Sequence, residues 1–159
     1  MGIEQIIQLL PHRYPFLFID RVTKYKKNKI ECRKNVTINE PYFQGHFNQN
    51  PIMPGVLMIE CAAQTAALMY ILDEMNYEAL KATEVSELCS SGELAKMVGY
   101  IAGVKGFKFT KIVRPGDCLV ITCMKTYEMN NLSEVTVNIC DENQQSICKG
   151  KIMVSKNES

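Results

Sequence analysis

The sequence predicts an α+β fold in which one long, buried helix is wrapped by an antiparallel β-sheet. Three observations favour this class. Residues Val56–Leu72 form an apolar segment of helical length. Strand-like patterns stand on both sides of it, two before and four after, and this order favours an antiparallel sheet over alternating parallel βα units. The 159 residues suffice for one core, so we expect a single domain over residues 1–159.

The first 38 residues predict a short helix and two strands. Apolar residues recur at helical spacing over Ile3–Leu10, and Pro11 ends this pattern. The apolar run Phe16–Ile19 is typical of a buried strand. Lys24–Lys29 favours a solvated hairpin, whose return strand we expect over Ile30–Ile38.

A long loop leads into the predicted helix. Residues 39–54 hold one glycine, Gly45, and three prolines, and an ordered loop of this length is commonly functional. Pro54 lacks an N–H and restricts its own φ, which suits the start of a helix. We therefore expect a helix that begins at Pro54–Gly55 and runs to about Glu74, buried on most faces because it is apolar nearly all round.

The remainder of the chain is β-like. After a polar, mixed stretch at 77–95, strand patterns cover Met97–Val113, Cys118–Tyr127, Leu132–Cys140 and Ser146–Val154, with a turn at Pro115-Gly116-Asp117. A long apolar helix wrapped by an antiparallel sheet in this way is the arrangement known as the hot dog fold.

Composition and charge exclude several classes of protein. The net charge of +1 gives no general attraction to nucleic acid. The seven cysteines form no C-x-x-C pair, which favours reduced thiols in a cytoplasmic protein over a disulfide framework or a zinc site. The N-terminus lacks the pattern of a signal peptide. Because the segment Val56–Leu72 is short for a span and contains Glu60 and Gln64, we expect no membrane insertion.

His46 is the first candidate catalytic residue. It is one of two histidines and lies in the proline-rich loop, within Phe43-Gln44-Gly45-His46-Phe47. Loops on rigid scaffolds commonly carry function, and imidazole exchanges protons near neutral pH. His46 is therefore interpreted as a general base, with an ordinary loop histidine as the alternative.

Glu60 is the second candidate. It lies in the apolar helix, where a carboxyl must be paired, hydrogen-bonded or protonated. Burial favours the protonated form, which suits a proton donor. Gln64 follows one turn later on the same face and could orient the Glu60 carboxyl. The alternative is that both residues meet a polar partner across an oligomer interface.

Gly55 adds a backbone N–H at the positive end of the helix, suited to a carbonyl oxygen that gains negative charge, although Pro-Gly is also a common way to begin a helix. These parts match one reaction, the removal of water across the α and β carbons of a thioester. His46 would take the α proton, the Gly55 N–H would stabilise the enolate-like oxygen, and Glu60 would protonate the departing hydroxyl.

The sequence resembles the β-hydroxyacyl-acyl-carrier-protein dehydratases of the FabZ type over nearly its whole length. The motifs that carry the resemblance are Leu10-Pro11-His12-Arg13-Tyr14-Pro15-Phe16-Leu17, Asp20-Arg21-Val22, Gly45-His46-Phe47, Pro51-Ile52-Met53-Pro54-Gly55-Val56-Leu57 with Glu60, Ala63 and Gln64, Tyr100-Ile101-Ala102-Gly103, Lys108-Phe109, Val113 and Pro115-Gly116-Asp117.

The resemblance implies a hot dog fold and the dehydration of (3R)-3-hydroxyacyl-[acyl-carrier-protein] to the trans-2-enoyl product in type II fatty acid synthesis, a hydro-lyase reaction without a metal or organic cofactor. The family's catalytic histidine falls on His46, its catalytic glutamate on Glu60 and its polarising amide on Gly55. Gln64 is similar to the family's glutamine beside the glutamate. Tyr100 is similar to an aromatic gate at the mouth of the acyl tunnel, and we expect both to contact substrate.

The resemblance also implies partners. The substrate would arrive on the phosphopantetheine arm of an acidic acyl carrier protein, which Lys105, Lys108, Lys111 and Arg114 could meet if they are not ordinary solvated charges. Homodimers would join their sheets edge to edge and assemble into hexamers, and each active site would take histidine from one subunit and glutamate from the other. The pathway, whether membrane lipid, lipid A of lipopolysaccharide, or polyketide, stays open.

Three features depart from the family pattern. Asn48 stands where proline usually follows His-Phe, Thr65-Ala66-Ala67 replaces Ala-Gly-Gly, and the segment 73–96 is longer by about ten residues, the length of roughly three turns of helix. A related branch that also isomerises the double bond usually has aspartate at the position of Glu60, so glutamate favours simple dehydration.

Two alternatives compete with the dehydratase interpretation. A hot dog acyl thioesterase would use a carboxylate with water rather than the pairing of His46 with Glu60. A weakly active subunit that partners another dehydratase is the other alternative, and Asn48 and the long 73–96 segment motivate it.

Overall fold

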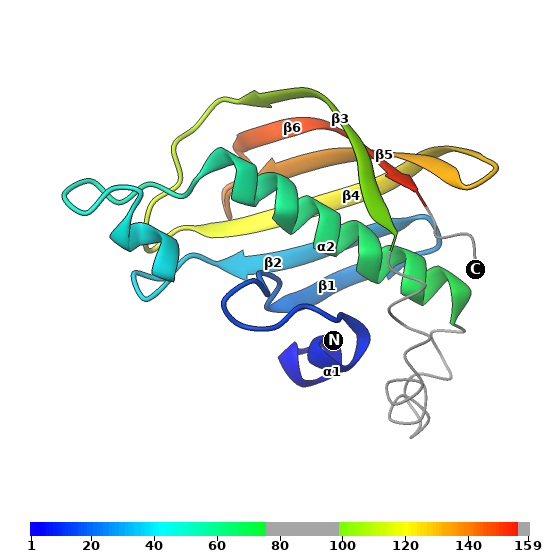
Figure 1. The fold of residues 1–159 in the computed structure, drawn as a ribbon, viewed down its shortest axis with the longest axis horizontal. Coiled ribbons are helices and arrows are strands. Elements are labelled where there is room, and N and C mark those ends of the chain that lie inside the picture. Colours follow the sequence, from blue (N-terminus) through cyan, green and yellow to red (C-terminus); the bar gives the residue numbers. More distant parts are fainter. Residues whose placement is uncertain (76–98, 156–159) are drawn as a thin grey trace.

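The computed structural model describes residues 1–75 and 99–155. Its elements follow the predicted order, with two strands before the long helix and four after it (Figure 1). In chain order they are α1 (Ile3–Leu9), β1 (Arg21–Lys26), β2 (Lys29–Asn35), the 3-10 helix η1 (Pro41–Gln44), α2 (Gly55–Glu74), β3 (Tyr100–Phe109), β4 (Cys118–Met129), β5 (Leu132–Cys140) and β6 (Ser146–Ser155).

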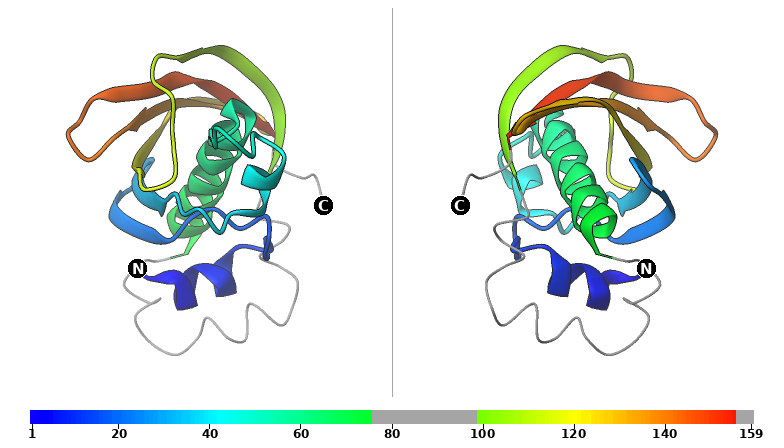
Figure 2. Two further views of the ribbon diagram at one scale, coloured as in Figure 1. Left: turned by 90° about the vertical axis from the view of Figure 1, so that its left-hand side faces the viewer. Right: turned by 90° about the vertical axis from the view of Figure 1, so that its right-hand side faces the viewer.

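The six strands form one antiparallel sheet in the order β1-β2-β4-β5-β6-β3. The sheet curves around α2, which lies along its concave face, and α1 lies beyond the helix on the side away from the sheet (Figure 2). The predicted α+β, hot dog arrangement is confirmed.

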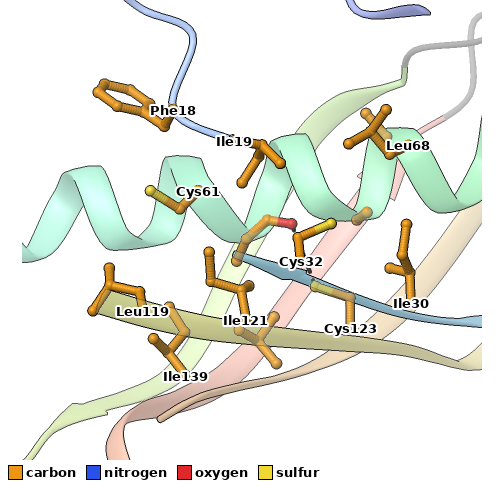
Figure 3. Close-up of a cluster of buried hydrophobic side chains, with 14 of the residues drawn as sticks. Phe18, Ile19, Ile30, Cys32, Cys61, Leu68, Leu119, Ile121, Cys123 and Ile139 are labelled. Atoms are coloured by element: carbon orange, nitrogen blue, oxygen red, sulfur yellow. Dashed lines mark hydrogen bonds between the residues drawn. The ribbon is translucent and has the colours of Figure 1, made fainter. Parts of the chain in front are cut away.

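The helix α2 is apolar on nearly every side because it is covered from two directions. Figure 3 shows Cys61 and Leu68 of α2 above Ile121 and Cys123 of β4, while Phe18 approaches from the N-terminal segment. All of these residues are buried. By length and composition alone α2 could cross a membrane, but most of it is buried inside the fold. Double coverage by sheet and N-terminal segment explains the missing polar face, as predicted for a buried helix.

One predicted strand is wrong. Phe16–Ile19 belongs to no strand: Phe16 lies in a bend, and the first strand, β1, begins only at Arg21. The backbone of this segment bonds to a side chain instead of a neighbouring strand: the Phe18 N–H donates to Gln64 Oε1 over 2.9 Å, and the Phe16 carbonyl accepts from Gln64 Nε2 over 2.8 Å. An apolar run predicts burial of Phe18 and Ile19 correctly, but it does not reveal which group will satisfy the backbone.

The predicted strand over Met97–Val113 is shorter in the structure, where β3 covers Tyr100–Phe109. Residues 110–117 leave the sheet and cross to β4, ending in the predicted turn, where Gly116 takes a φ of 99°. The stretch at 77–95 lies outside the described residues, as does most of the 73–96 segment.

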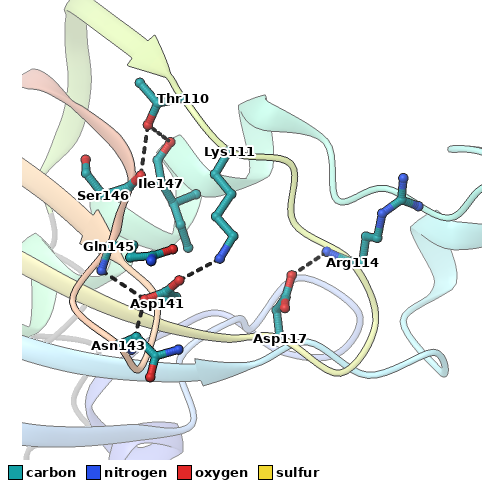
Figure 4. A network of polar contacts seen from close by, with 9 residues as sticks. All are labelled: Thr110, Lys111, Arg114, Asp117, Asp141, Asn143, Gln145, Ser146 and Ile147. Carbon is teal, nitrogen blue, oxygen red and sulfur yellow. Dashed lines mark hydrogen bonds and ion pairs between the residues drawn. The ribbon is translucent and has the colours of Figure 1, made fainter.

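Polar contacts hold the crossover at 110–117 in place (Figure 4). Lys111 Nζ lies 2.6 Å from Asp141 Oδ2, and the backbone N–H of Arg114 donates to Asp117 Oδ2 over 2.8 Å. The ammonium of Lys111, aided by backbone N–H groups, lowers the pKa of the Asp141 carboxyl. The crossover is therefore tied at Lys111 to Asp141, directly after β5.

The six cysteines in the described part of the chain are unpaired and buried. Burial raises the pKa of the Cys32 thiol to about 12. Such thiols pack as small apolar groups and are poor nucleophiles.

Candidate active site

Glu60 lies on α2 and lines a cavity of about 330 Å³ between the helix, the N-terminal segment and the first residues of β3. Its side chain is 18% exposed. The cavity is lined by His12, Glu60, Ala63, Gln64, Ala67, Gly99, Tyr100 and Ile101. The predicted site residues Glu60, Gln64 and Tyr100 thus meet in one cavity, with Tyr100 exposed at its margin.

Gln64 is fully buried, and both the oxygen and the nitrogen of its side-chain amide form hydrogen bonds. Its Oε1 accepts the Phe18 N–H, so the amide nitrogen must face the other way. Its two N–H groups then donate to the Phe16 carbonyl and to Glu60 Oε1, each over 2.8 Å. Gln64 therefore holds Glu60 in one orientation, as the i, i+4 spacing predicted.

His12 is the site residue that sequence reasoning missed. Its Nε2 lies 3.5 Å from Glu60 Oε1, and its side chain is 24% exposed. Burial chiefly lowers the pKa of His12; Glu60 acts in the opposite direction and Arg13 in the same direction. His12 stands in one of the motifs that carry the family resemblance, but no local pattern places it beside a residue 48 positions further along the chain.

His46 is held by the loop that contains it. Its backbone N–H donates to the Tyr42 carbonyl of η1 over 2.9 Å, and its carbonyl accepts the Ile52 N–H over 3.0 Å. Its ring nitrogen Nδ1 lies 2.7 Å from the Ile52 carbonyl oxygen. A carbonyl can only accept a hydrogen bond, so Nδ1 carries a proton, and in the neutral form of the ring the lone pair therefore lies on Nε2.

The crossover supports this loop from the side. The Met53 N–H donates to the Val113 carbonyl over 2.9 Å, and Arg114 Nη1 donates to Asn50 Oδ1 over 2.6 Å. Asn48 itself is exposed. With the bond of His46 before it and those of Asn50 and Met53 after it, the loop is anchored on both sides of Asn48.

Gly55 is the first residue of α2, with Pro54 as the N-cap. The N–H of a first helical residue has no partner within the helix. A Cβ at this position would lie 3.2 Å from ring carbons of Phe109 on β3. Glycine therefore keeps a free backbone donor close to an aromatic side chain of the edge strand.

The predicted site residues fall into two groups within one chain. Glu60, Gln64 and Tyr100 share the cavity, whereas His46 and Gly55 belong to the loop and the first turn at the N-terminal end of α2. No hydrogen bond or ion pair between described residues joins His46 to Glu60. Nor do residues 1–75 and 99–155 contain a cluster of three side chains that could hold a metal ion.

The fold and the carboxyl-lined cavity beside its central helix define a protein of the hot dog class. Solved structures agree on the fold: the dehydratase heterocomplex ApeI:P from Xenorhabdus doucetiae superposes with a TM-score of 0.67 at 15% identity, covering 97% of this chain and 91% of that one. Zebra fish thioesterase superfamily member 2 superposes with a TM-score of 0.63 at 12% identity, covering 99% of both chains.

Sequence comparison shows to which family within the hot dog class the chain belongs. Residues 10–156 match the family of FabA-like domains. The 3-hydroxyacyl-[acyl-carrier-protein] dehydratase FabZ of Polynucleobacter asymbioticus is 46% identical over 123 residues, which cover 77% of this chain and 70% of that protein. The FabZ of Buchnera aphidicola is 40% identical over 158 residues, covering 98% and 93%. The chain belongs to the FabZ-type dehydratases of the FabA-like family.

Proposed function

We propose that this chain is a hydro-lyase that dehydrates (3R)-3-hydroxyacyl-[acyl-carrier-protein] to the trans-2-enoyl product in fatty acid biosynthesis. Membership of the FabZ-type dehydratases supports the reaction. Two hydrogen bonds support the mechanism. The bond from His46 Nδ1 to the Ile52 carbonyl leaves Nε2 available as a base, and the bond from Gln64 orients the Glu60 carboxyl.

The reaction follows from these groups. His46 Nε2 removes the α proton of the thioester, and the electrons pass into the carbonyl, whose oxygen gains negative charge. The Gly55 N–H, at the positive end of α2, stabilises that oxygen. Glu60 then protonates the β hydroxyl, the C–O bond breaks, and water leaves as the α,β double bond forms. Gln64 holds the carboxyl during this step, and Tyr100 contacts the acyl chain at the cavity mouth.

We propose that two copies of the chain complete each site. Within one chain His46 does not line the cavity that Glu60 lines, which supports this, because the base and the acid must act on adjacent carbons. The edge strand β3 supports it as well, since no strand within residues 1–75 and 99–155 pairs with its outer edge and it carries exposed apolar side chains, notably Tyr100, Ile101, Val104 and Phe109. Pairing of two β3 strands would cover them in a homodimer, three of which would form the hexamer.

The carrier protein would dock on a basic hollow, which we define as Lys105, Lys108, Lys149 and Lys151 on β3 and β6. The hollow encloses about 390 Å³. Two of the four cations expected from the sequence, Lys105 and Lys108, belong to it. The other two are bonded within the loops, Lys111 to Asp141 and Arg114 to Asn50. Within the hollow, Lys151 Nζ also lies 2.6 Å from Glu134 Oε1, so Lys105, Lys108 and Lys149 supply most of the long-range attraction to an acidic partner.

Reversing charge in the basic hollow tests the docking. The double variant Lys105→Glu, Lys108→Glu should raise KM for the carrier-linked substrate by roughly tenfold or more, because it replaces charges that attract the acidic carrier protein by charges that repel it. The N-acetylcysteamine thioester of the same acyl chain should be turned over unchanged, since it brings no protein. An unchanged KM for the carrier-linked substrate would remove the hollow from the docking surface.

The decisive experiment for the reaction is turnover of 3-hydroxybutyryl-acyl-carrier-protein, followed by the ultraviolet absorbance of the enoyl product. The wild type should be active, and His46→Ala and Glu60→Gln should each lose roughly 10²–10⁴ in kcat, the usual contribution of a general acid or base. Hydrolysis of the thioester without enoyl product would favour a thioesterase. Inactivity of a folded wild type that copurifies with another dehydratase would favour a partner subunit.

We propose that the reaction takes place in the cytoplasm, within the single domain formed by residues 1–159.

A further inference from the structure

The contacts around Glu60 leave one oxygen of its carboxyl more constrained than the other. Gln64 Nε2 donates to Oε1, and His12 Nε2 approaches the same Oε1 to 3.5 Å. Gln64 cannot turn away, because its own Oε1 is bonded to the Phe18 N–H. Oε2 is therefore the oxygen left to carry the catalytic proton.

The contacts also indicate which nitrogen of His12 carries its proton. Nδ1 is buried and has no hydrogen-bond partner among the described residues. A proton on Nδ1 would be a buried, unsatisfied donor, and it would turn the Nε2 lone pair toward an oxygen that already accepts from Gln64. A proton on Nε2 instead aims a donor at Glu60 Oε1.

The ring is suited to act in its neutral form. Burial, the largest influence, lowers the pKa of His12, and Arg13 lowers it further, while Glu60 raises it. Tyr100 of β3 also lines the cavity. A neutral donor orients the carboxyl without forcing it to stay ionised, as an imidazolium would.

We propose that His12 is a positioning residue for Glu60, donating its Nε2–H to Oε1 and so leaving Oε2 to exchange the proton with substrate. The inference rests on the proposed dehydration for its catalytic meaning. The separation of 3.5 Å is longer than a formed hydrogen bond. Catalytic hydrogen bonds are often long in the free enzyme and tighten when substrate binds.

Two similar variants separate positioning from packing. In His12→Gln the amide nitrogen takes the place of Nε2 and can reach Glu60, whereas in His12→Asn it takes the place of Nδ1 and cannot. His12→Asn should lower kcat by roughly 10- to 100-fold, the scale for a misplaced catalytic group, with KM within about twofold. His12→Gln should recover most of kcat at equal thermal stability. Wild-type kcat in His12→Asn, or no recovery in His12→Gln, would overturn the proposal.

A second measurement is independent of turnover. The chain has two histidines, so ¹⁵N-histidine labelling gives two imidazoles, which His46→Ala assigns. His12 should be the Nε2-protonated neutral tautomer, and its pKa should fall further in Glu60→Gln because the attraction of the carboxylate is lost. An Nδ1-protonated ring, or a pKa unaffected by Glu60→Gln, would refute the pairing. A wild type without dehydratase activity but with this signature would refute the proposed function and leave the pairing intact.

Discussion

Gly55 illustrates how a single residue can matter through its backbone. Its N–H lies at the first position of α2, where the helix supplies no acceptor. The residue before it, Pro54, has φ −59° and ψ 134°, the conformation that a following proline requires. Proline is also well tolerated at the first position of a helix. The donor can therefore be removed without an expected break in the fold.

Gly55→Pro should lower kcat by roughly 10²–10³ relative to Gly55→Ala, which is the usual cost of one lost oxyanion donor. Both variants place a Cβ about 3.2 Å from Phe109, so their packing costs are similar. Steady-state kinetics on the carrier-linked substrate gives the comparison, and thermal unfolding checks that both variants fold. Equal kcat values in the two variants would show that the Gly55 N–H does not act on the substrate.

Between elements, a buried ion pair ties the loop of His46 to the sheet. Lys34 on β2 is 3% exposed at its side chain, and its Nζ lies 2.5 Å from Glu40 Oε1. Glu40 is the N-cap of η1, and η1 supplies the Tyr42 carbonyl that accepts the His46 N–H. The Lys34 ammonium also lies 5.3 Å from the centroid of the Phe18 ring, a favourable cation–π contact. The strand, the ion pair and the short helix thus form one support for the loop that carries His46.

Lys34→Met should destabilise the fold by about 3–5 kcal/mol, because it leaves the Glu40 carboxylate largely buried without its partner. The double variant Lys34→Met, Glu40→Leu should be less destabilised, since an apolar pair removes the unpaired charge. Urea unfolding followed by circular dichroism measures both. If the double variant lost as much stability as the single one, the ion pair would not be what holds η1 to β2.

For the whole molecule, the question is whether one chain or two build each active site. The edge position of β3 and its exposed apolar residues favour pairing between copies. A two-fold dimer has two equivalent sites. If each site took His46 from one chain and Glu60 from the other, a substitution in one chain would damage only the site to which that chain contributes the substituted residue.

Mixing the inactive variants His46→Ala and Glu60→Gln after reversible dissociation should therefore restore activity. In a mixed dimer one site receives both defects and the other receives none, so random pairing should yield about a quarter of wild-type activity. Turnover before and after mixing gives the answer, and mixing either variant with itself is the control. Sites built within one chain would show no restoration.

The local pattern of the sequence predicted much of this structure. The helix bounds at Pro54–Gly55 and Glu74, the strands after residue 117 and the turn at Gly116 all follow from periodicity and turn chemistry, which depend on near neighbours. The partnership of Gln64 with Glu60 followed from i, i+4 spacing on a helix.

Only the tertiary structure decided the remainder, because the partners of buried polar groups come from distant parts of the chain. The backbone at Phe16–Ile19 bonds to Gln64 instead of to a strand, and His12 stands beside Glu60. Lys111 and Arg114 bond within loops while Lys149 and Lys151 join the basic hollow. Hydrophobic periodicity determines which face of an element is buried, but which donor meets which acceptor there is determined only when the elements pack.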